Sequence, residues 1–182
     1  MLTEASITSL PTAHIRSLVL AGYFMTKWNQ TEERLRYMLC SALGLSFSQG
    51  LIVFAETPTA ALINTALKVG DIVVEGGQDK DRIARALKRL HALNSVRKKL
   101  AHRGFGAGPQ GDLVIVTSES GNVEMAAAYT INQILDFCTE LDSIATDLSS
   151  VSDVLAAQST AAHERTMKEL EALWQGSEDP LF

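Results

Sequence analysis

Apolar side chains that recur every three or four residues are the feature that most constrains how this chain can fold. Between residues 12 and 45 one face at about 100° per residue is formed by Phe24, Trp28, Thr31, Leu35, Met38, Leu39 and Ala42. The same period returns in residues 79–102 and 130–150. Proline, which interrupts helices, is scarce at four residues of 182. The sequence therefore predicts a protein built mainly of amphipathic helices that pack through their apolar faces.

Local start and stop signals give approximate boundaries. Gly44 is expected to end the first long helix, and Thr57-Pro58 to begin a helix over about residues 58–74. Residues 104–111, with four glycines and a proline, indicate a loop. Residues 112–127 predict a β-hairpin that turns over Ser120-Gly121-Asn122. Thr130 should cap the last long helix, which the SSVS stretch (residues 149–152) would weaken before one more helix over residues 160–174.

These elements predict an all-α fold, a bundle of four or five helices with one short β-hairpin inserted before the last long helix. The length of 182 residues suits one domain with an appended tail. We expect residues 1–14 to form an N-terminal lead, residues 15–150 the helical domain, and residues 151–182 a C-terminal helix with a frayed end.

Several classes of protein are not indicated by the sequence. The N-terminal stretch MLTEASITSLPTAHIR has an early acid and no basic region before an apolar run, and the apolar run LVLAGYFM is only eight residues long. Both features favour a cytoplasmic location for the protein. Cys40 and Cys138 lie within helical patterns and are expected to be core thiols. The four histidines are scattered without the spacing of metal ligands, so no metal or other cofactor is expected.

The charge is distributed unevenly along the chain. Residues 80–103 contain nine basic residues and one acid, a net +8, so the rest of the chain carries −13 of the total of −5. A basic helix on an acidic body suits a polyanion such as RNA. The alternative is that the helix packs beside acidic helices and the charges neutralise one another.

Arg97 lies inside the apolar stripe of this basic helix. With Ile83 at 0°, Arg97 falls near 320° and Asn94 near 20°, on the same side as Leu90 and Leu93 at about 340° and 280°. Burying an unpaired guanidinium is expensive, so Arg97 must meet a carboxylate, a ring of carbonyls, or a cleft that holds water or phosphate.

His102 lies about 140° around the helix from Arg97, so spacing alone does not place the two on one face. They would converge if the helix loosened at Arg103-Gly104, or if a second subunit supplied half of a shared cleft. The alternatives are structural: an ion pair of Arg97 with Glu32, and a histidine favoured at a helix C-terminus by the helix dipole.

The segment RKKLAHRGF, in which four residues separate Arg97 from His102, resembles the Arg-x4–6-His motif of the HEPN superfamily. The earlier segment FMTKWNQTEERLRYML resembles the Trp-x3-Glu-x2-Leu pattern of some bacterial members, through Trp28, Glu32 and Leu35. The resemblance covers roughly residues 15–150. It departs from the family at Lys98, where the residue after the arginine is often Asn, Asp or His.

The resemblance implies a metal-independent endoribonuclease that leaves 2′,3′-cyclic phosphate ends, or a non-catalytic relative that binds RNA or a nucleotide. Members usually form symmetric homodimers whose two motifs face one cleft. In this chain Arg97 would stabilise the phosphorane and His102 would transfer protons. Glu32 and Asn94 would be positioning residues.

The resemblance also implies a bacterial or phage defence or toxin–antitoxin context, with a cognate antitoxin or other protein as partner. Lys98, Lys99 and Arg103 are the candidate contacts to RNA phosphates. The competing hypothesis is a non-catalytic helical interaction module that binds a protein or a nucleotide through the bundle.

Overall fold

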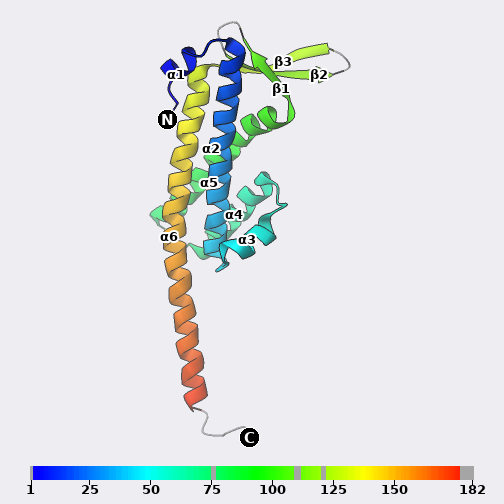
Figure 1. Cartoon of the computed structure of the whole chain (residues 1–182). Helices are drawn as coiled ribbons and strands as arrows, with labels where there is room; N and C mark the ends of the chain where they lie inside the picture. Colours follow the sequence, from blue (N-terminus) through cyan, green and yellow to red (C-terminus); the bar gives the residue numbers. More distant parts are fainter. Residues whose placement is uncertain (1, 75–76, 109–111, 120–121, 177–182) are drawn as a thin grey trace.

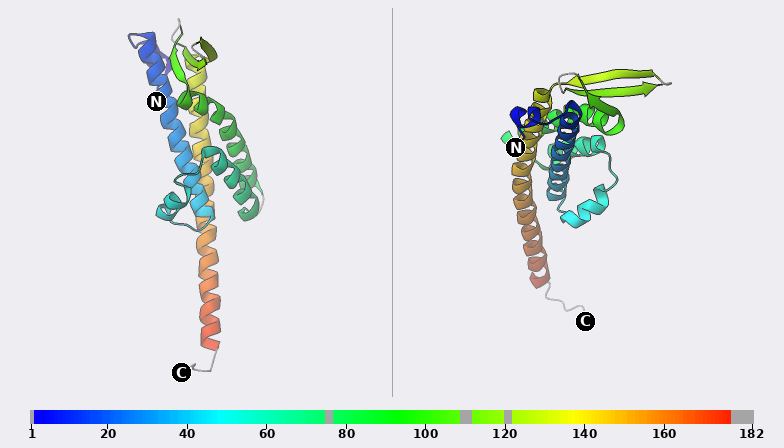
Figure 2. Two further views of the ribbon diagram at one scale, coloured as in Figure 1. Left: turned by 90° about the vertical axis from the view of Figure 1, so that its right-hand side faces the viewer. Right: turned by 45° about the horizontal axis from the view of Figure 1, so that its top comes forward.

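Two long helices form the axis of the molecule. The computed structural model describes residues 2–74, 77–108, 112–119 and 122–176. Helices α2 (Ala13–Ala42) and α6 (Ile131–Gly176) run side by side in the same direction (Figure 1). Helices α4 (Thr59–Val73) and α5 (Gln78–His102) form a hairpin that packs against this pair (Figure 2). The all-α prediction with a small β-element before the last long helix is confirmed.

The core lies where these four helices meet. Phe24, Trp28 and Leu35, which the period of α2 predicted to face inward, are fully buried. They are met by Leu87 and Leu90 of α5, which are equally buried, and by an apolar stripe of α6 that comprises Ile134, Cys138, Leu141, Ile144, Leu148, Val151 and Leu155. The stripe recurs every three or four residues, so α6 buries one face along its first half and exposes the other.

The predicted helix ends are explained by local hydrogen bonds. Thr12 caps α2 through its hydroxyl, which accepts from the backbone N–H of Ile15. Gly44 follows the end of α2 with a φ of +63°, and the N–H of Leu45 donates to the carbonyl of Cys40 at 2.9 Å. This is the pattern in which a glycine in the left-handed region ends a helix. Helix α4 begins one residue later than predicted, with Pro58 as its N-cap.

The prediction of a loop over residues 104–111 was wrong for its first half. Gly104–Ala107 form strand β1, which pairs with β2 (Leu113–Glu119), and β2 pairs with β3 (Asn122–Tyr129), so the expected hairpin is a three-stranded antiparallel sheet. The turn predicted at Ser120-Gly121-Asn122 lies mostly outside the described residues. Leu113 and Ile115 are fully buried and attach the sheet to the helices.

Two short helices were not predicted. Helix α1 (Glu4–Thr8) begins with a capping box between Thr3 and Ser6 and buries Ile7, so the lead is ordered there. Helix α3 (Phe47–Phe54) begins with a second capping box, between Ser46 and Gln49. No single described helix is long and apolar enough to cross a membrane; only α2 taken together with α3 meets that test, and the two bend by 112° at their break.

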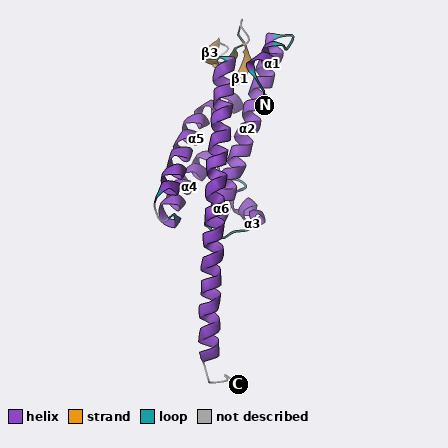
Figure 3. Ribbon diagram, turned by 90° about the vertical axis from the view of Figure 1, so that its left-hand side faces the viewer, coloured by secondary structure: helices purple, strands orange, loops and turns teal. Residues whose placement is uncertain are grey.

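The separate helix predicted over residues 160–174 is instead part of α6. Ser149–Ser152 do not interrupt α6, and the hydroxyl of the buried Ser152 donates to the carbonyl of Leu148 at 2.8 Å within the helix. Beyond Ser159, whose hydroxyl lies beside Gly44 at the end of α2, the helix projects past the other elements (Figure 3).

Candidate functional site

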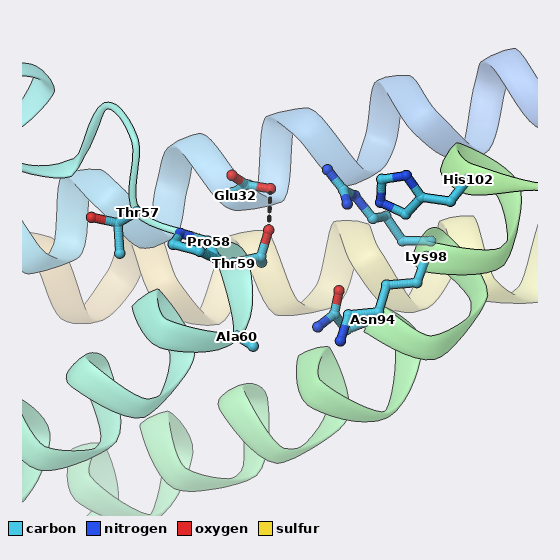
Figure 4. A pocket seen from close by; sticks show the side chains of 9 residues that line it. Glu32, Thr57, Pro58, Thr59, Ala60, Asn94, Lys98 and His102 are labelled. Atoms are coloured by element: carbon cyan, nitrogen blue, oxygen red, sulfur yellow. Dashed lines mark hydrogen bonds between the residues drawn. The ribbon is translucent and has the colours of Figure 1, made fainter.

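A pocket of about 290 Å³ opens between α2, the start of α4 and the last turns of α5. Five of the residues predicted as functional line it: Glu32, Asn94, Arg97, Lys98 and His102. Figure 4 shows Asn94, Lys98 and His102 on α5 across from Glu32 on α2 and Thr59 on α4. The remaining lining comes from residues 57–60, which were predicted only as a helix start.

Lys99 and Arg103, the other predicted phosphate contacts, do not line the pocket. Arg103 is exposed and extended, with φ −124° and ψ 156°, so the helix ends at His102. Lys99 is half-buried and lies about 100° around α5 from Lys98. Neither residue forms part of the pocket wall, although Lys99 follows Lys98 and Arg103 follows His102 in the sequence.

Arg97 and His102 line the same pocket of one chain, although they are five residues apart on a regular helix. The loosening that would bring them together does not occur before Arg103, whose N–H still donates to the carbonyl of Lys99 at 3.1 Å. Instead, the pocket runs along the last two turns of α5 and reaches both residues. A second subunit is therefore not needed to bring the guanidinium and the imidazole to one cavity.

Both carboxylate oxygens of Glu32 are already engaged by neighbouring donors. Its Oε2 accepts hydrogen bonds from Trp28 Nε1 and Thr59 Oγ1, both at 3.0 Å, and its Oε1 pairs with Arg36 at 2.6 Å. These bonds join α2 to the start of α4. The ion pair of Arg97 with Glu32 is not formed, and no described carboxylate lies within 4.0 Å of Arg97.

Two buried polar atoms beside the pocket have no hydrogen-bond partner among the described residues. They are Oδ1 of Asn94 and Nε of Arg97. Asn94 is only 4% exposed. An unsatisfied buried polar group is unfavourable by roughly 1–3 kcal/mol, and such groups in native proteins usually mark a site for water, an ion or a ligand.

The N-terminus of α4 adds positive potential to the opposite wall. Thr59 and Ala60, the first residues of α4, both line the pocket. The first N–H groups of a helix lack partners within the helix and favour anions. The pocket therefore combines a guanidinium, an ammonium and a helix N-terminus, which together suit a phosphate.

The two ends of the basic helix α5 have different environments. In its first half, Arg89 pairs with Glu140 at 2.9 Å and with Asp147 at 3.6 Å, and Arg82 lies 3.9 Å from Asp147. Neutralisation by neighbouring acids is thus correct for Arg82 and Arg89. At the other end, none of Arg97, Lys98, Lys99 and Arg103 forms an ion pair with a described residue.

Both cysteines are buried free thiols, as predicted, and neither lines the pocket. Burial raises the pKa of Cys138 to about 12, with a further contribution from Asp142. Burial also raises the pKa of Cys40. Within the described part of the chain, no group of three or more His, Cys, Asp or Glu side chains could hold a metal ion.

Comparisons of the chain with protein-family models, curated proteins and solved structures give no match. What the pocket can do therefore follows from its own groups. They are the half-buried guanidinium of Arg97, the ammonium of Lys98, the imidazole of His102 at the end of α5, and Asn94 with its unpaired oxygen.

Proposed function

We propose that this protein is a HEPN-like endoribonuclease that cleaves single-stranded RNA without a metal ion. The observation that carries the proposal is that Arg97, unpaired among the described residues, lines one pocket with His102. A cation fixed in a recess favours the charge that gathers on a phosphorane, and histidine is the side chain best suited to proton transfer near neutral pH.

The chemistry needs no group beyond these residues, the substrate and water. The 2′-oxygen of the ribose attacks the adjacent phosphorus as its proton leaves, and the bond from phosphorus to the 5′-oxygen breaks. The products are a 2′,3′-cyclic phosphate and a 5′-hydroxyl. His102 moves a proton at one of these two oxygens, water exchanges the proton at the other, and Arg97 binds the non-bridging oxygens.

The other lining residues take supporting roles. Lys98 and the N-terminus of α4 hold the phosphate in the pocket. Asn94 offers an acceptor to a hydroxyl of the substrate. Glu32 is a positioning residue, because it is occupied by three donors and holds α4 against α2. Lys99 and Arg103 extend the positive surface for the RNA on either side.

The wider setting of the proposal comes from the resemblance to the HEPN superfamily. From it we propose a bacterial or phage defence or toxin–antitoxin system, with a cognate antitoxin as partner and a homodimer as the working form, and from the N-terminal sequence we propose a cytoplasmic location. Recovery of a small protein that binds the chain and blocks cleavage would support this setting.

The test is cleavage of end-labelled single-stranded RNA in EDTA. Wild type should cleave, and His102→Ala and Arg97→Ala should each lose about 100-fold or more in rate. His91→Ala is the matched control, because His91 is an exposed histidine of α5 outside the pocket. RNA with 2′-O-methyl groups should remain intact. Cleavage that survives in His102→Ala would refute the proposal.

A second candidate is a non-catalytic module that binds RNA or a nucleotide in the same pocket. It is favoured by Lys98, which lines the pocket at the position where the family often has Asn, Asp or His. Binding without cleavage would weaken with salt, and Lys98→Ala would reduce the slope of log K against log [salt] by about 0.7 for single-stranded RNA.

A further inference from the structure

The outward face of α5 carries basic side chains that point away from the neighbouring helices. With the buried Ile83 at 0°, the positions between about 140° and 200° belong to Arg85, Lys88, Ala92 and Lys99. Figure 2 and Figure 3 show α5 along an outer edge of the bundle. Arg85 and Lys88 are exposed and Lys99 is half-buried. These three residues form an outer stripe about 21 Å long, at 1.5 Å per residue.

The basic side chains on the two flanks of α5 are neutralised, whereas the outer stripe is not. On the flank toward α6, at about 240°, Arg89 pairs with Glu140 at 2.9 Å. On the flank toward α4, at about 60°, Lys80 pairs with Asp71 at 3.2 Å. Within the described part of the chain, no residue of the outer stripe forms an ion pair. The stripe therefore keeps its three positive charges.

The outer stripe ends at an acid on one side and reaches the candidate pocket on the other. Asp81, the only acid of α5 on this face, lies one turn before Arg85 and ends the positive run. At the opposite end Lys99 follows Lys98, which lines the pocket. Lys98 falls at about 60° and Lys99 at about 160° around α5. A polyanion that leaves the pocket past Lys98 therefore meets the stripe on the same helix.

The composition of this face suits a phosphate backbone better than a lipid surface. The middle of the face is formed by Ala92 and Ser95, which are exposed and small. The hydroxyl of Ser95 donates to the carbonyl of Ala92 at 3.0 Å, so it lies against its own helix. A backbone can approach α5 closely there, and the cations at both ends are typical phosphate contacts. No large apolar side chain of α5, which the structure describes in full, is exposed to enter a bilayer.

We propose that a single RNA strand held in the pocket continues along the outer stripe, with its phosphates on Lys99, Lys88 and Arg85. The inference rests on the proposed function for the presence of RNA in the pocket, and it adds a length requirement to the substrate. At about 3.4 Å per nucleotide in a stacked strand, a stripe of about 21 Å takes about six nucleotides beyond the pocket. A trinucleotide fills the pocket and leaves the stripe uncovered.

Binding of a fluorescent 2′-O-methyl RNA of about twelve nucleotides, measured by anisotropy over a series of salt concentrations, tests the stripe without cleavage. Arg85→Ala combined with Lys88→Ala should reduce the slope of log K against log [salt] by about 1.4, or about 0.7 for each contact. With affinities that converge near 1 M salt, this is about 25-fold weaker binding at 0.1 M salt. Arg34→Ala combined with Lys168→Ala is the matched control, because both residues are exposed and lie on other helices. Circular dichroism confirms that each variant is folded.

A trinucleotide separates the stripe from the pocket. Lys88 lies about 15 Å from Lys98 along α5, which exceeds the screening length of about 8–10 Å. The Arg85→Ala, Lys88→Ala variant should therefore bind and cleave a trinucleotide as the wild type does. For the long strand with free 2′-hydroxyls, KM should rise about 25-fold at 0.1 M salt and kcat should stay unchanged.

Three binding results would each overturn the proposal: an unchanged slope and affinity for the long strand, an equal loss in the control variant, or an equal loss for the trinucleotide. Binding of the wild type to phosphatidylserine vesicles without binding of the long strand would also overturn it, in favour of a lipid surface. RNA cleavage with unchanged binding in the Arg85→Ala, Lys88→Ala variant would leave the proposed function standing and remove the stripe. Stripe-dependent binding without any cleavage by the wild type would support the stripe and remove the endoribonuclease.

Discussion

Replacing Glu32 with alanine is expected to destabilise the fold by about 2–5 kcal/mol, through the donors that it leaves unpaired. The indole N–H of Trp28 is fully buried, and Thr59 is only 8% exposed. Each buried donor without an acceptor is unfavourable by about 1–3 kcal/mol, with the rotatable Thr59 hydroxyl near the lower end. Arg36, whose side chain is 22% exposed, can turn toward water and adds little.

Glu32→Gln separates this effect from a loss of charge. The amide oxygen can accept from both Trp28 and Thr59, so the variant should lose at most about 1 kcal/mol, through the pair with Arg36. In a Trp28→Phe background the indole donor is gone, and Glu32→Ala should be less destabilising by about 1–2 kcal/mol.

The assay is urea unfolding followed by circular dichroism, with the slope of each transition compared between variants. Equal losses in the alanine and glutamine variants, or a loss below about 1 kcal/mol in Glu32→Ala, would refute the reasoning from unpaired donors. Such a result would free Glu32 for a role as a proton acceptor in the pocket.

Two further predictions concern the core. A Cβ at Gly50 would lie 1.9 Å from the sulfur of Cys40, so Gly50→Ala should lower the free energy of unfolding by about 1–3 kcal/mol. In a Cys40→Ala background the sulfur is gone, so alanine, which is a better helix former than glycine, should be neutral or stabilising. Urea unfolding of the wild type, the two single variants and the double variant tests both expectations. With a pKa of about 12, about one Cys138 side chain in a thousand is a thiolate at pH 9. In a Cys40→Ala variant, alkylation of Cys138 by iodoacetamide at pH 9 should therefore be at least about 100-fold slower in the native protein than in the urea-unfolded protein. Similar rates in the two states would contradict the buried environment of Cys138.

The parts of the fold that could be predicted are those specified by nearby residues. The apolar period of α2 and the glycine after it are signals within one segment, and both were interpreted correctly. Strand β1 was missed because its glycines indicate a loop when considered alone. A side chain at Gly104 would approach Val116 to 3.1 Å, so the glycine permits close pairing with β2, a strand that lies about ten residues further along. Strand formation here depends on a neighbour that the local pattern does not contain.

The residues of the candidate site also divide into those that one segment specifies and those that depend on another segment. Arg97 was identified because a charge within an apolar stripe is visible on one helix. The sequence could not show that Arg97 has no described acid beside it. That depends on the carboxylate of Glu32 being engaged by Thr59, which lies on a different helix. Thr59 itself gave no signal, since the helix start was predicted from Thr57 and Pro58 and the residue after them carries no pattern of its own. The bonds of Glu32 with Trp28 and Arg36, four residues away on either side, could have been anticipated from spacing.

Ion pairing of the acidic side chains explains how a chain of net charge −5 can present a cationic pocket. Three carboxylates beside the basic helix or the pocket are already paired: Glu140 and Asp147 with Arg89, and Glu32 with Arg36. Asp142 is hydrogen-bonded to Lys27 at 2.8 Å, a contact that raises the pKa of Lys27. Potential inside a recess depends on the charges that remain unpaired close by, since more distant exposed charges are screened within about 8–10 Å. Binding of an anion beside Arg97 is therefore governed by these local pairings rather than by the total charge of the chain.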